Sequence, residues 1–385
     1  MRLRITALAA ALLALAPTLA AAQADPPRDA AHPPGMEELT IPSGTTRMNG
    51  FIYLAQGAGP HPVVVFLHGY PGNERNLDLA QAVRRAGWHA LYFDYRGSWG
   101  SGGTFGFQNA LDDVEAALTW LRAPETRTRF RVDADRIAIV GHSVGAWLAM
   151  MHAADDPATR CVAPLDPANR GATGKRARAE PNRDFGAYFR QTTHPEAGPI
   201  RARADDLMRE LVRNADRWDY TDLAPALKGT SVLFIASTAE AEAGRQTLTR
   251  RLADAGATHV RSLHYDDDHP FSAHRLALAD ELVTWLRGDC AAVQGGESAR
   301  PAQPHAFVPA NGFVPDSASA VAIAEVALTP IYGRGQIESE RPFRAALQGD
   351  TWTVTGSLPP GRVGGVAVVE ISRRDGRILR VTHGR

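Results

Sequence analysis

Strand-like and helix-like segments alternate through most of this sequence. A two-stranded hairpin is predicted at residues 36–55, followed by continuous apolar runs and by stretches with apolar residues at helical spacing. The predicted strands beyond the hairpin are 63–67, 90–93, 136–140, 161–165, 230–236 and 260–265. The predicted helices are 76–86, 109–121, 145–154, 246–255 and 275–286. This alternation implies right-handed βαβ units, and we therefore predict an α/β fold with a doubly wound sheet.

One segment interrupts the alternation, and a second unit follows the predicted sheet. Residues 166–227 contain a basic, glycine-rich stretch and then amphipathic helical stretches around 184–191 and 200–215. Because binding loops lie at the carboxyl ends of such strands, we expect this insertion to form a lid; a solvated surface excursion is the alternative. The main domain then spans 36–290. A Gly-, Ser- and Pro-containing linker is expected at 291–313, before a small α+β domain of one helix and four strands at 314–385.

The first residues have the layout of a cleavable secretory signal. A positively charged start, Met1-Arg-Leu-Arg4, precedes an apolar run at residues 5–16 and several small residues. The apolar run is short for a membrane span, which needs ~20 residues. We therefore expect cleavage after Ala24, no stable membrane anchor, a proline-rich spacer at 25–35, and export to the periplasm or the exterior.

The two cysteines of the chain are Cys161 and Cys290. Cys161 opens a predicted strand and Cys290 follows the last helix of the main domain, so both are expected at one edge of the sheet. An oxidising compartment permits a disulfide between them, and two unpaired thiols are the equally weighted alternative. Neither cysteine has a nearby histidine that would make it a convincing nucleophile.

Gly141-His-Ser-Val-Gly145 lies between a predicted buried strand and a predicted helix. In this setting the two glycines let the chain turn sharply, so that the serine backbone takes a strained conformation and its oxygen stands clear of the sheet. A serine presented in this way can attack an acyl carbon. We predict Ser143 as a nucleophile.

A serine hydroxyl needs a base, and His269 is the predicted one. It lies in Asp-Asp-Asp-His269-Pro-Phe, between the last strand and the last helix, where the chain order nucleophile, acid, histidine places the base. His264 within the strand and His274 at the start of the helix suit structural roles better. His68 and His142 are also expected to be structural.

The acid that orients His269 is expected in the loop after the strand 230–236, at residues 237–242. This loop contains no aspartate, so we predict Glu240, with Glu242 as its nearest substitute. The aspartates at 266–268 stay open as alternatives, although the last of them is adjacent to the histidine and badly placed to reach it.

A tetrahedral oxyanion needs backbone N–H donors. The predicted donors are the N–H of Val144, directly after the nucleophile, and the N–H of Tyr70 in the loop His68-Gly-Tyr-Pro-Gly72. An ordinary turn between strand and helix is the alternative reading of that loop. This chemistry requires no metal and no organic cofactor.

These motifs resemble the α/β-hydrolase superfamily over about residues 36–290. The stretch Phe93-Asp-Tyr-Arg-Gly-Ser-Trp-Gly-Ser-Gly-Gly103 looks like the loop after the fourth strand in dienelactone-hydrolase-like, serine-aminopeptidase-like and prolyl-oligopeptidase-like members. The nucleophile is serine rather than cysteine, so the chain is not a dienelactone hydrolase in the strict sense. The resemblance implies a serine hydrolase that cleaves esters or amides through an acyl-enzyme, and we favour a carboxylesterase over a peptidase.

The segment 314–385 resembles the small NTF2-fold immunity-protein-like domains. The resemblance is carried by 320–333, 341–343, 352–356 and 364–371. It implies a binding or packing module whose partner stays open. A catalytically weak hydrolase fold that serves as a binding or immunity module is therefore the alternative to an enzyme.

Charge narrows the range of partners. The chain has 42 Lys and Arg against 42 Asp and Glu, a formal net charge of zero. This balance gives no support to binding of nucleic acid or of another polyanion. We expect a small-molecule or peptide acyl substrate.

Overall fold

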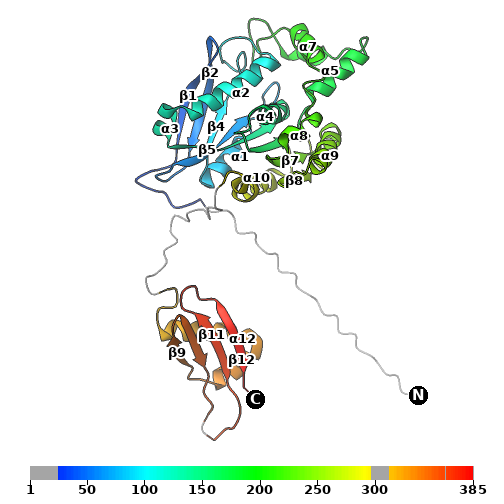
Figure 1. Ribbon diagram of the computed structural model, residues 1–385. Helices are drawn as coiled ribbons and strands as arrows, with labels where there is room; N and C mark the ends of the chain where they lie inside the picture. Colours follow the sequence, from blue (N-terminus) through cyan, green and yellow to red (C-terminus); the bar gives the residue numbers. More distant parts are fainter. Residues whose placement is uncertain (1–24, 296–311, 360, 385) are drawn as a thin grey trace, which may run out of the picture. The chain divides into compact units, whose positions relative to one another are not determined.

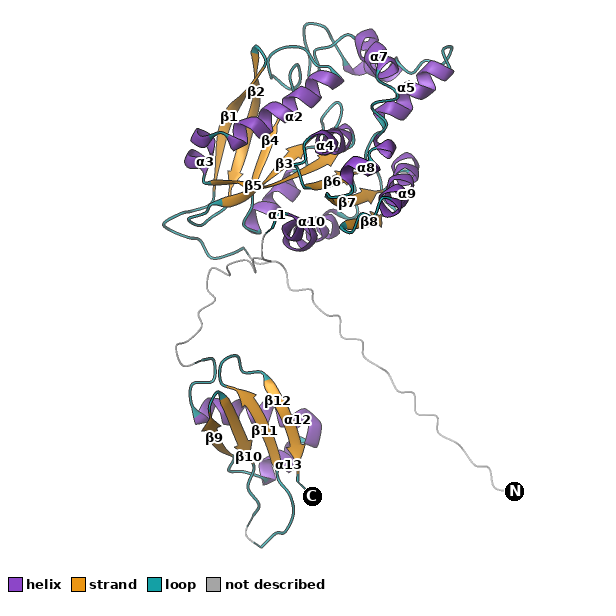
Figure 2. Cartoon of the chain, viewed as in Figure 1, coloured by secondary structure: helices purple, strands orange, loops and turns teal. Residues whose placement is uncertain are grey.

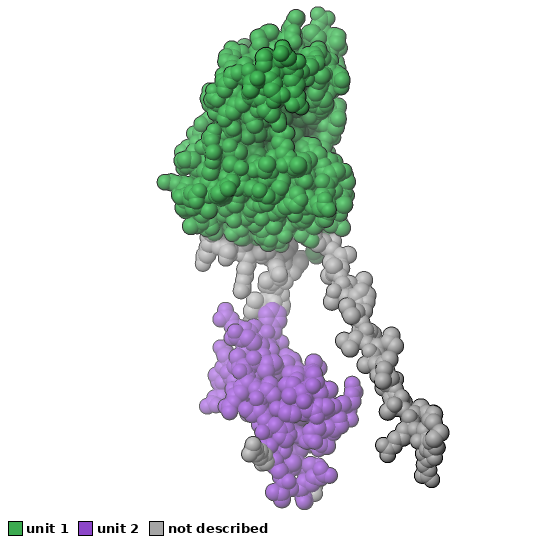
Figure 3. Space-filling model, turned by 90° about the vertical axis from the view of Figure 1, so that its right-hand side faces the viewer, with its two compact units in different colours: residues 1–301 green, residues 302–385 purple. Residues whose placement is uncertain are grey.

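The computed structural model describes residues 25–295, 312–359 and 361–384. The predicted signal at 1–24 and most of the predicted linker therefore lie outside the described residues. The chain divides into two compact units, Met1–Pro301 and Ala302–Arg385, which Figure 3 shows in different colours. Each unit is described by itself.

The first unit is built on an eight-stranded sheet with the order β1-β2-β4-β3-β5-β6-β7-β8 (Figure 1). The hairpin of β1 (Gly35–Ser43) and β2 (Thr46–Leu54) is antiparallel, and β2 is also antiparallel to β4. All other neighbouring pairs are parallel. The remaining strands are β3 (His61–Leu67), β4 (His89–Phe93), β5 (Val132–His142), β6 (Cys161–Leu165), β7 (Ser231–Ala236) and β8 (Val260–His264). The predicted α/β fold is confirmed.

Helices cover both faces of this sheet (Figure 2). Successive side chains of a strand point to opposite faces, so a continuous apolar run supplies two cores at once. In β3, Val63 and Val65 belong to one core, and Val64 and Phe66 belong to the other. The first core includes α2 (Phe107–Arg122), α3 (Pro124–Phe130), α4 (Val144–Asp155) and α9 (Ala239–Asp254). The second includes α1 (Leu77–Arg85) and α10 (Arg275–Trp285).

The insertion between β6 and β7 is helical over more of its length than predicted. Its elements are α5 (Arg170–Ala179), α6 (Ala187–Thr192), α7 (Ala204–Arg213), the 3₁₀ turn η1 (Tyr220–Asp222) and α8 (Ala224–Leu227). The glycine-rich stretch is the helix α5, whose N-terminus is capped by the Asn169 side chain through the Ala172 N–H at 3.0 Å. A Cβ on Gly174 would lie 2.2 Å from the carbonyl oxygen of Leu211, so glycine lets α5 pack closely on α7.

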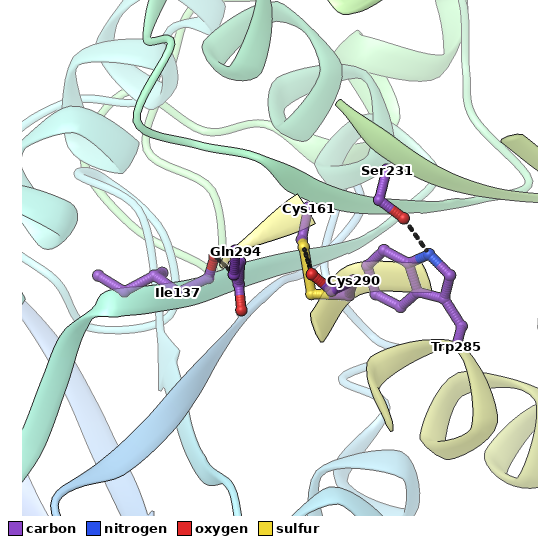
Figure 4. Close-up of a disulfide and its surroundings, with 6 residues drawn as sticks. All are labelled: Ile137, Cys161, Ser231, Trp285, Cys290 and Gln294. Carbon is purple, nitrogen blue, oxygen red and sulfur yellow. Dashed lines mark hydrogen bonds between the residues drawn. A yellow bond between two sulfur atoms is a disulfide. The ribbon is translucent and has the colours of Figure 1, made fainter. Parts of the chain in front are cut away.

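A disulfide between Cys161 and Cys290 joins β6 to the end of the first unit (Figure 4). The Trp285 indole N–H beside it donates to the Ser231 hydroxyl at 2.9 Å (Figure 4). The chain continues through the π-helix η2 (Leu286–Cys290) and α11 (Ala291–Val293). The Gln294 amide then donates to the carbonyl oxygen of Ile137 at 2.9 Å, so packing extends beyond Cys290 into residues predicted as linker.

The second unit packs two helices against a four-stranded antiparallel sheet of order β12-β11-β10-β9. Its helices are α12 (Ser317–Tyr332) and α13 (Arg334–Ser339), and its strands are β9 (Arg344–Gln348), β10 (Thr351–Thr355), β11 (Ala367–Ser372) and β12 (Ile378–His383). Alternate residues of β10 and β11, such as Trp352, Val354 and Val369, are buried with Ala324 and Leu328 of α12. The predicted small α+β domain is confirmed.

Candidate active site

Five parallel strands end at one edge of the first sheet. The register pairs Leu67 with Gly141, His142 with Leu165, and Ala236 with His264, so the carboxyl ends of β3, β5, β6, β7 and β8 lie together. Ligand sites of open α/β sheets lie outside such carboxyl ends. The residues that follow these strands are therefore brought to a common edge.

Ser143 stands at the tight turn between β5 and α4. Its backbone has φ 57° and ψ −115°, which is strained for a residue with a side chain. Two glycines allow the turn: a Cβ on Gly141 would lie 2.1 Å from the carbonyl oxygen of Gly145, and one on Gly145 would lie 2.1 Å from that of Leu67. The Ser143 N–H donates to the carbonyl oxygen of Leu165 at 2.9 Å, which ties the turn to β6.

His269 is held by a carboxylate other than the predicted Glu240. Its Nδ1 lies 2.5 Å from Oδ2 of Asp166, the first residue after β6. The Asp166 side chain is fully buried, and its Oδ1 accepts the N–H groups of Ser237 at 2.7 Å and Thr238 at 2.9 Å. Burial raises the pKa of Asp166, but the hydrogen bonds from His269 and from the two N–H groups outweigh it and lower the pKa below its usual value. Asp166 is therefore a carboxylate that accepts the proton on Nδ1.

His142 fixes the position of the His269 backbone. Its Nε2 lies 2.9 Å from the carbonyl oxygen of His269, and the two rings are 4.5 Å apart. Burial, with a smaller contribution from the charge of His269, lowers the pKa of His142 to about 4. The imidazole is thus neutral at pH 7, and the carbonyl acceptor places its single proton on Nε2. Its buried Nδ1, which has no hydrogen-bond partner among the described residues, then carries no proton.

Glu240 does not contact His269, and the prediction that it orients this histidine is corrected by the geometry. The Thr238 side chain caps α9 by accepting the Ala241 N–H at 3.4 Å, so the helix begins at Ala239, seven positions earlier than predicted. Glu240 therefore lies on the first helical turn, where its exposed carboxylate pairs with Arg176 at 3.2 Å.

Among the other predicted alternatives, Glu242, Asp267 and Asp268 are engaged elsewhere. Glu242 binds Arg245 and lies 3.1 Å from His264. Asp267 lies 2.8 Å from His274 Nδ1, and the Asp268 carboxylate accepts the Ser272 N–H at 2.8 Å. A signal for Asp166 was present in the sequence, because it directly follows a predicted strand that ends at the same edge as the serine and histidine.

The loop that carries Tyr70 lies against Ser143. A Cβ on Gly69 would be 2.9 Å from Cβ and 3.5 Å from Oγ of Ser143, so only glycine permits this approach. His68 supports the loop, because its Nδ1 lies 2.7 Å from the Gly69 carbonyl oxygen and burial lowers its pKa to about 4. On the other side of Ser143, Val144 is the first residue of α4, so its N–H has no acceptor within the helix.

The insertion contacts this same loop. The Tyr70 hydroxyl lies 2.8 Å from the Thr192 hydroxyl of α6, and its ring packs edge-on against Phe189 at 5.3 Å. Burial raises the pKa of Tyr70 to about 12, so the phenol stays protonated. The insertion also contacts the loop after β4, where the backbone N–H of Trp99 donates to the carbonyl oxygen of Pro199 at 2.7 Å. The helix α6 therefore borders the edge that holds Ser143 and His269.

The described part of the chain contains neither a metal-binding cluster nor a membrane-spanning helix. In residues 25–295, 312–359 and 361–384, no group of three or more His, Cys, Asp or Glu side chains is arranged to hold a metal ion. None of the helices described in these ranges has both the length and the apolar character needed to cross a bilayer.

Known proteins resemble the two units separately. Residues 43–295 match the model of the X-Pro dipeptidyl-peptidase (S15) family, and residues 319–385 match that of NTF2 fold immunity proteins. Among solved structures, Est1E from Butyrivibrio proteoclasticus with bound ferulic acid has a TM-score of 0.51 and 17% identity, covering 66% of this chain and 99% of that chain. At this identity the likeness is one of fold.

Curated relatives match shorter stretches. An uncharacterized protein of Mycobacterium tuberculosis H37Rv is 30% identical over 131 residues, which is 34% of this chain and 45% of that protein. Lysophosphatidylserine lipase ABHD12 of Rattus norvegicus is 30% identical over 95 residues, which is 24% of this chain and 22% of the lipase. The chain thus spans less than half the length of these relatives.

The strand order, the turn at Ser143 and the S15 match over residues 43–295 agree on the class of the first unit. The first unit has an α/β-hydrolase fold, the second unit is an NTF2-like domain, and the chain belongs to the X-Pro dipeptidyl-peptidase (S15) family.

Proposed function

We propose that this hydrolase is an exported serine enzyme that cleaves ester or amide bonds through an acyl-enzyme, with Ser143, Asp166 and His269 as its triad. The observation that carries the proposal is the buried Asp166 carboxylate, 2.5 Å from His269 Nδ1, at the sheet edge where Ser143 occupies a strained turn. Chain order agrees as well, since nucleophile, acid and histidine follow one another as in other α/β-hydrolases.

The proposed reaction has two halves. The Ser143 oxygen attacks the acyl carbon while His269 Nε2 takes its proton, and Asp166 stabilises the imidazolium through Nδ1–H. The N–H groups of Val144 and Tyr70 donate to the tetrahedral oxyanion. His269 then returns the proton to the leaving group, which departs and leaves the acyl-enzyme. In the second half, water attacks the acyl carbon and His269 takes its proton. The collapse then breaks the ester bond to Ser143, His269 returns the proton to the Ser143 oxygen, and the acid is released.

Ester cleavage is our first choice of reaction, and peptide cleavage is the second. The match to a peptidase family over residues 43–295 favours the second. A panel of 4-nitrophenyl esters of different chain lengths, assayed beside aminoacyl and X-prolyl anilides, decides between them by the ratio of kcat/KM values.

Export is proposed from two features. Residues 1–24 have the layout of a secretory signal, and the Cys161–Cys290 disulfide suits an oxidising compartment. Expression of the full chain, followed by N-terminal sequencing of the protein recovered outside the cytoplasm, tests this. The expected N-terminus is Asp25, and intact chain retained in the cytoplasm contradicts export.

Active-site labelling tests serine catalysis. A fluorophosphonate probe is expected to label the wild-type protein and to leave Ser143→Ala unlabelled, because the probe reacts with an activated serine. Ser317→Ala is the matched control, since this serine is exposed on α12 of the other unit, and it should label like the wild type. Folded wild-type protein that takes no label, or label that persists in Ser143→Ala, contradicts the proposal.

A further inference from the structure

Arg170, at the start of α5, is a half-buried cation that forms no ion pair with any described residue. Its Nε atom is buried and has no hydrogen-bond partner among the described residues. The guanidinium carbon lies 5.7 Å from the centre of the Phe107 ring, which provides a face but no acceptor. The Glu240 carboxylate stabilises the Arg170 charge at longer range, but its ion pair is with Arg176, at 3.2 Å.

Other arginines of the same helix behave differently. Arg176 pairs with Glu240, and Arg178 pairs with Asp216 at 2.9 Å. Both are exposed, whereas burial lowers the pKa of Arg170 to about 10. Taking a guanidinium out of water without a partner is unfavourable, and a bound anion would restore the lost interactions.

The position of Arg170 relates it to the proposed reaction. It follows Asp166 by four residues, and between them the Ala168 N–H donates to the carbonyl oxygen of Ser143 at 3.1 Å. The Phe107 ring, over which the Arg170 guanidinium lies, is 6.3 Å from the Tyr70 ring and 5.9 Å from the Phe189 ring of α6. Arg170 is thus linked to the serine turn through Ala168, and to the loop of Tyr70 and the helix α6 through Phe107.

We propose that Arg170 binds an anionic group of the substrate, a carboxylate or a phosphate carried by an ester whose scissile carbonyl lies at Ser143. A guanidinium presents a planar fork of N–H groups that matches such an anion with two parallel hydrogen bonds. The rings of Phe107, Tyr70 and Tyr188 beside it suit the apolar part that joins the anion to the ester. This inference rests on the proposed function, because it assigns specificity to the same site.

The test compares esters that differ only in charge. The 4-nitrophenyl hemiester of adipic acid is paired with 4-nitrophenyl methyl adipate, its neutral counterpart, and kcat/KM is measured for both. The wild type is expected to prefer the hemiester about tenfold or more, and Arg170→Met is expected to reduce this preference by roughly ten- to hundredfold. Arg170→Lys should keep part of the preference. Arg178→Met removes an exposed arginine of the same helix and should leave it unchanged.

Two further pairs locate and identify the anion. A carboxylate on the leaving group is supplied by 4-carboxyphenyl butyrate, with 4-carbamoylphenyl butyrate as its neutral partner. A phosphate is supplied by the butyrate ester of 4-hydroxyphenyl phosphate, with the butyrate ester of 4-hydroxyphenyl dimethyl phosphate as its neutral partner. The pair with the largest preference in the wild type, and the largest loss in Arg170→Met, identifies the group and its side of the ester.

Failure of this inference is distinguishable from failure of the proposed function. If the fluorophosphonate labels Ser143 but no anionic ester is preferred, or if Arg170→Met affects charged and neutral esters equally, only the anion site is overturned. If Ser143 takes no label and no ester is cleaved, the proposed function fails and the anion site fails with it. If Arg170→Met does not fold, the wild type alone tests the anion site. A preference for anionic esters that decreases at high ionic strength supports the site, and the absence of such a preference overturns it.

Discussion

Oδ2 of Asp166 lies 2.5 Å from Nδ1 of His269, across the edge where β6 and β8 end. The other carboxylate oxygen accepts two N–H groups from the turn after β7. One buried side chain therefore joins the loops that follow three strands of the sheet. This connection holds the histidine ring in one orientation without a contribution from Glu240.

Asp166→Asn should reduce kcat of ester hydrolysis by roughly 10³- to 10⁴-fold, because an amide cannot stabilise the imidazolium and favours the wrong tautomer. Glu240→Gln is the matched control and should change kcat less than about threefold, since this exposed group pairs only with Arg176 at the surface. Steady-state kinetics of both purified variants provide the measurement. A larger loss in Glu240→Gln than in Asp166→Asn would refute the assignment.

Gly145→Ala should destabilise the first unit by more than about 2 kcal/mol and abolish ester hydrolysis. The new Cβ would lie 2.1 Å from the carbonyl oxygen of Leu67 and 2.7 Å from that of His68, and backbone atoms have little room to relax. Gly229→Ala is the control, because a Cβ there meets nothing within 4 Å and should leave both properties unchanged. Urea unfolding followed by circular dichroism compares the two, and equal midpoints would contradict the proposed crowding.

Acid should destabilise the first unit between pH 6.5 and pH 4. Burial lowers the pKa of His68 and of His142 to about 4 from the ordinary 6.5, so the unfolded chain binds protons in this window that the folded chain does not. The stabilisation from the neutral histidines is therefore complete above pH 6.5 and is lost as the pH falls through about 4. The expected loss by pH 5 is roughly 1–2 kcal/mol for each histidine.

The pH series is checked by urea unfolding of the wild type and of His142→Asn. Asparagine cannot take up the proton, so the variant should lose less free energy of unfolding than the wild type between pH 7 and pH 5. Parallel curves for the two proteins would show that His142 does not contribute to the acid sensitivity.

Removal of the disulfide should lower the free energy of unfolding by about 2–4 kcal/mol, because the bond closes a long loop in the unfolded chain. The two cysteines are 129 residues apart in sequence. A Cys161→Ala, Cys290→Ala double variant should unfold at lower urea concentration than the oxidised wild type, and dithiothreitol should shift only the wild type. An unshifted wild type under reducing conditions would contradict this contribution.

The sequence by itself determined the layout of the first unit. Apolar runs of the length of strands, separated by helical periodicity, allow few arrangements other than an α/β sheet, and the first unit has such a sheet. Gly141-His-Ser-Val-Gly145 predicted a turn that places Ser143 at the sheet edge, and the strained backbone at Ser143 agrees with it. Both features follow from local sequence patterns, namely the periodicity of strands and helices and the tight turn between a strand and the next helix.

Tertiary structure alone decided which acid meets His269. Asp166 and Glu240 each follow a strand that ends at the same edge, so position along the chain did not separate them. The cap of Thr238 on α9 separates them, because it turns Glu240 toward Arg176 and directs the N–H groups of Ser237 and Thr238 to Asp166. The same holds for Arg170, whose unpaired charge becomes visible only once helices far apart in sequence are packed. Local sequence patterns determine the helices and strands and where the strands end. The hydrogen-bond partners of a side chain depend on distances between segments, which only the packed chain defines.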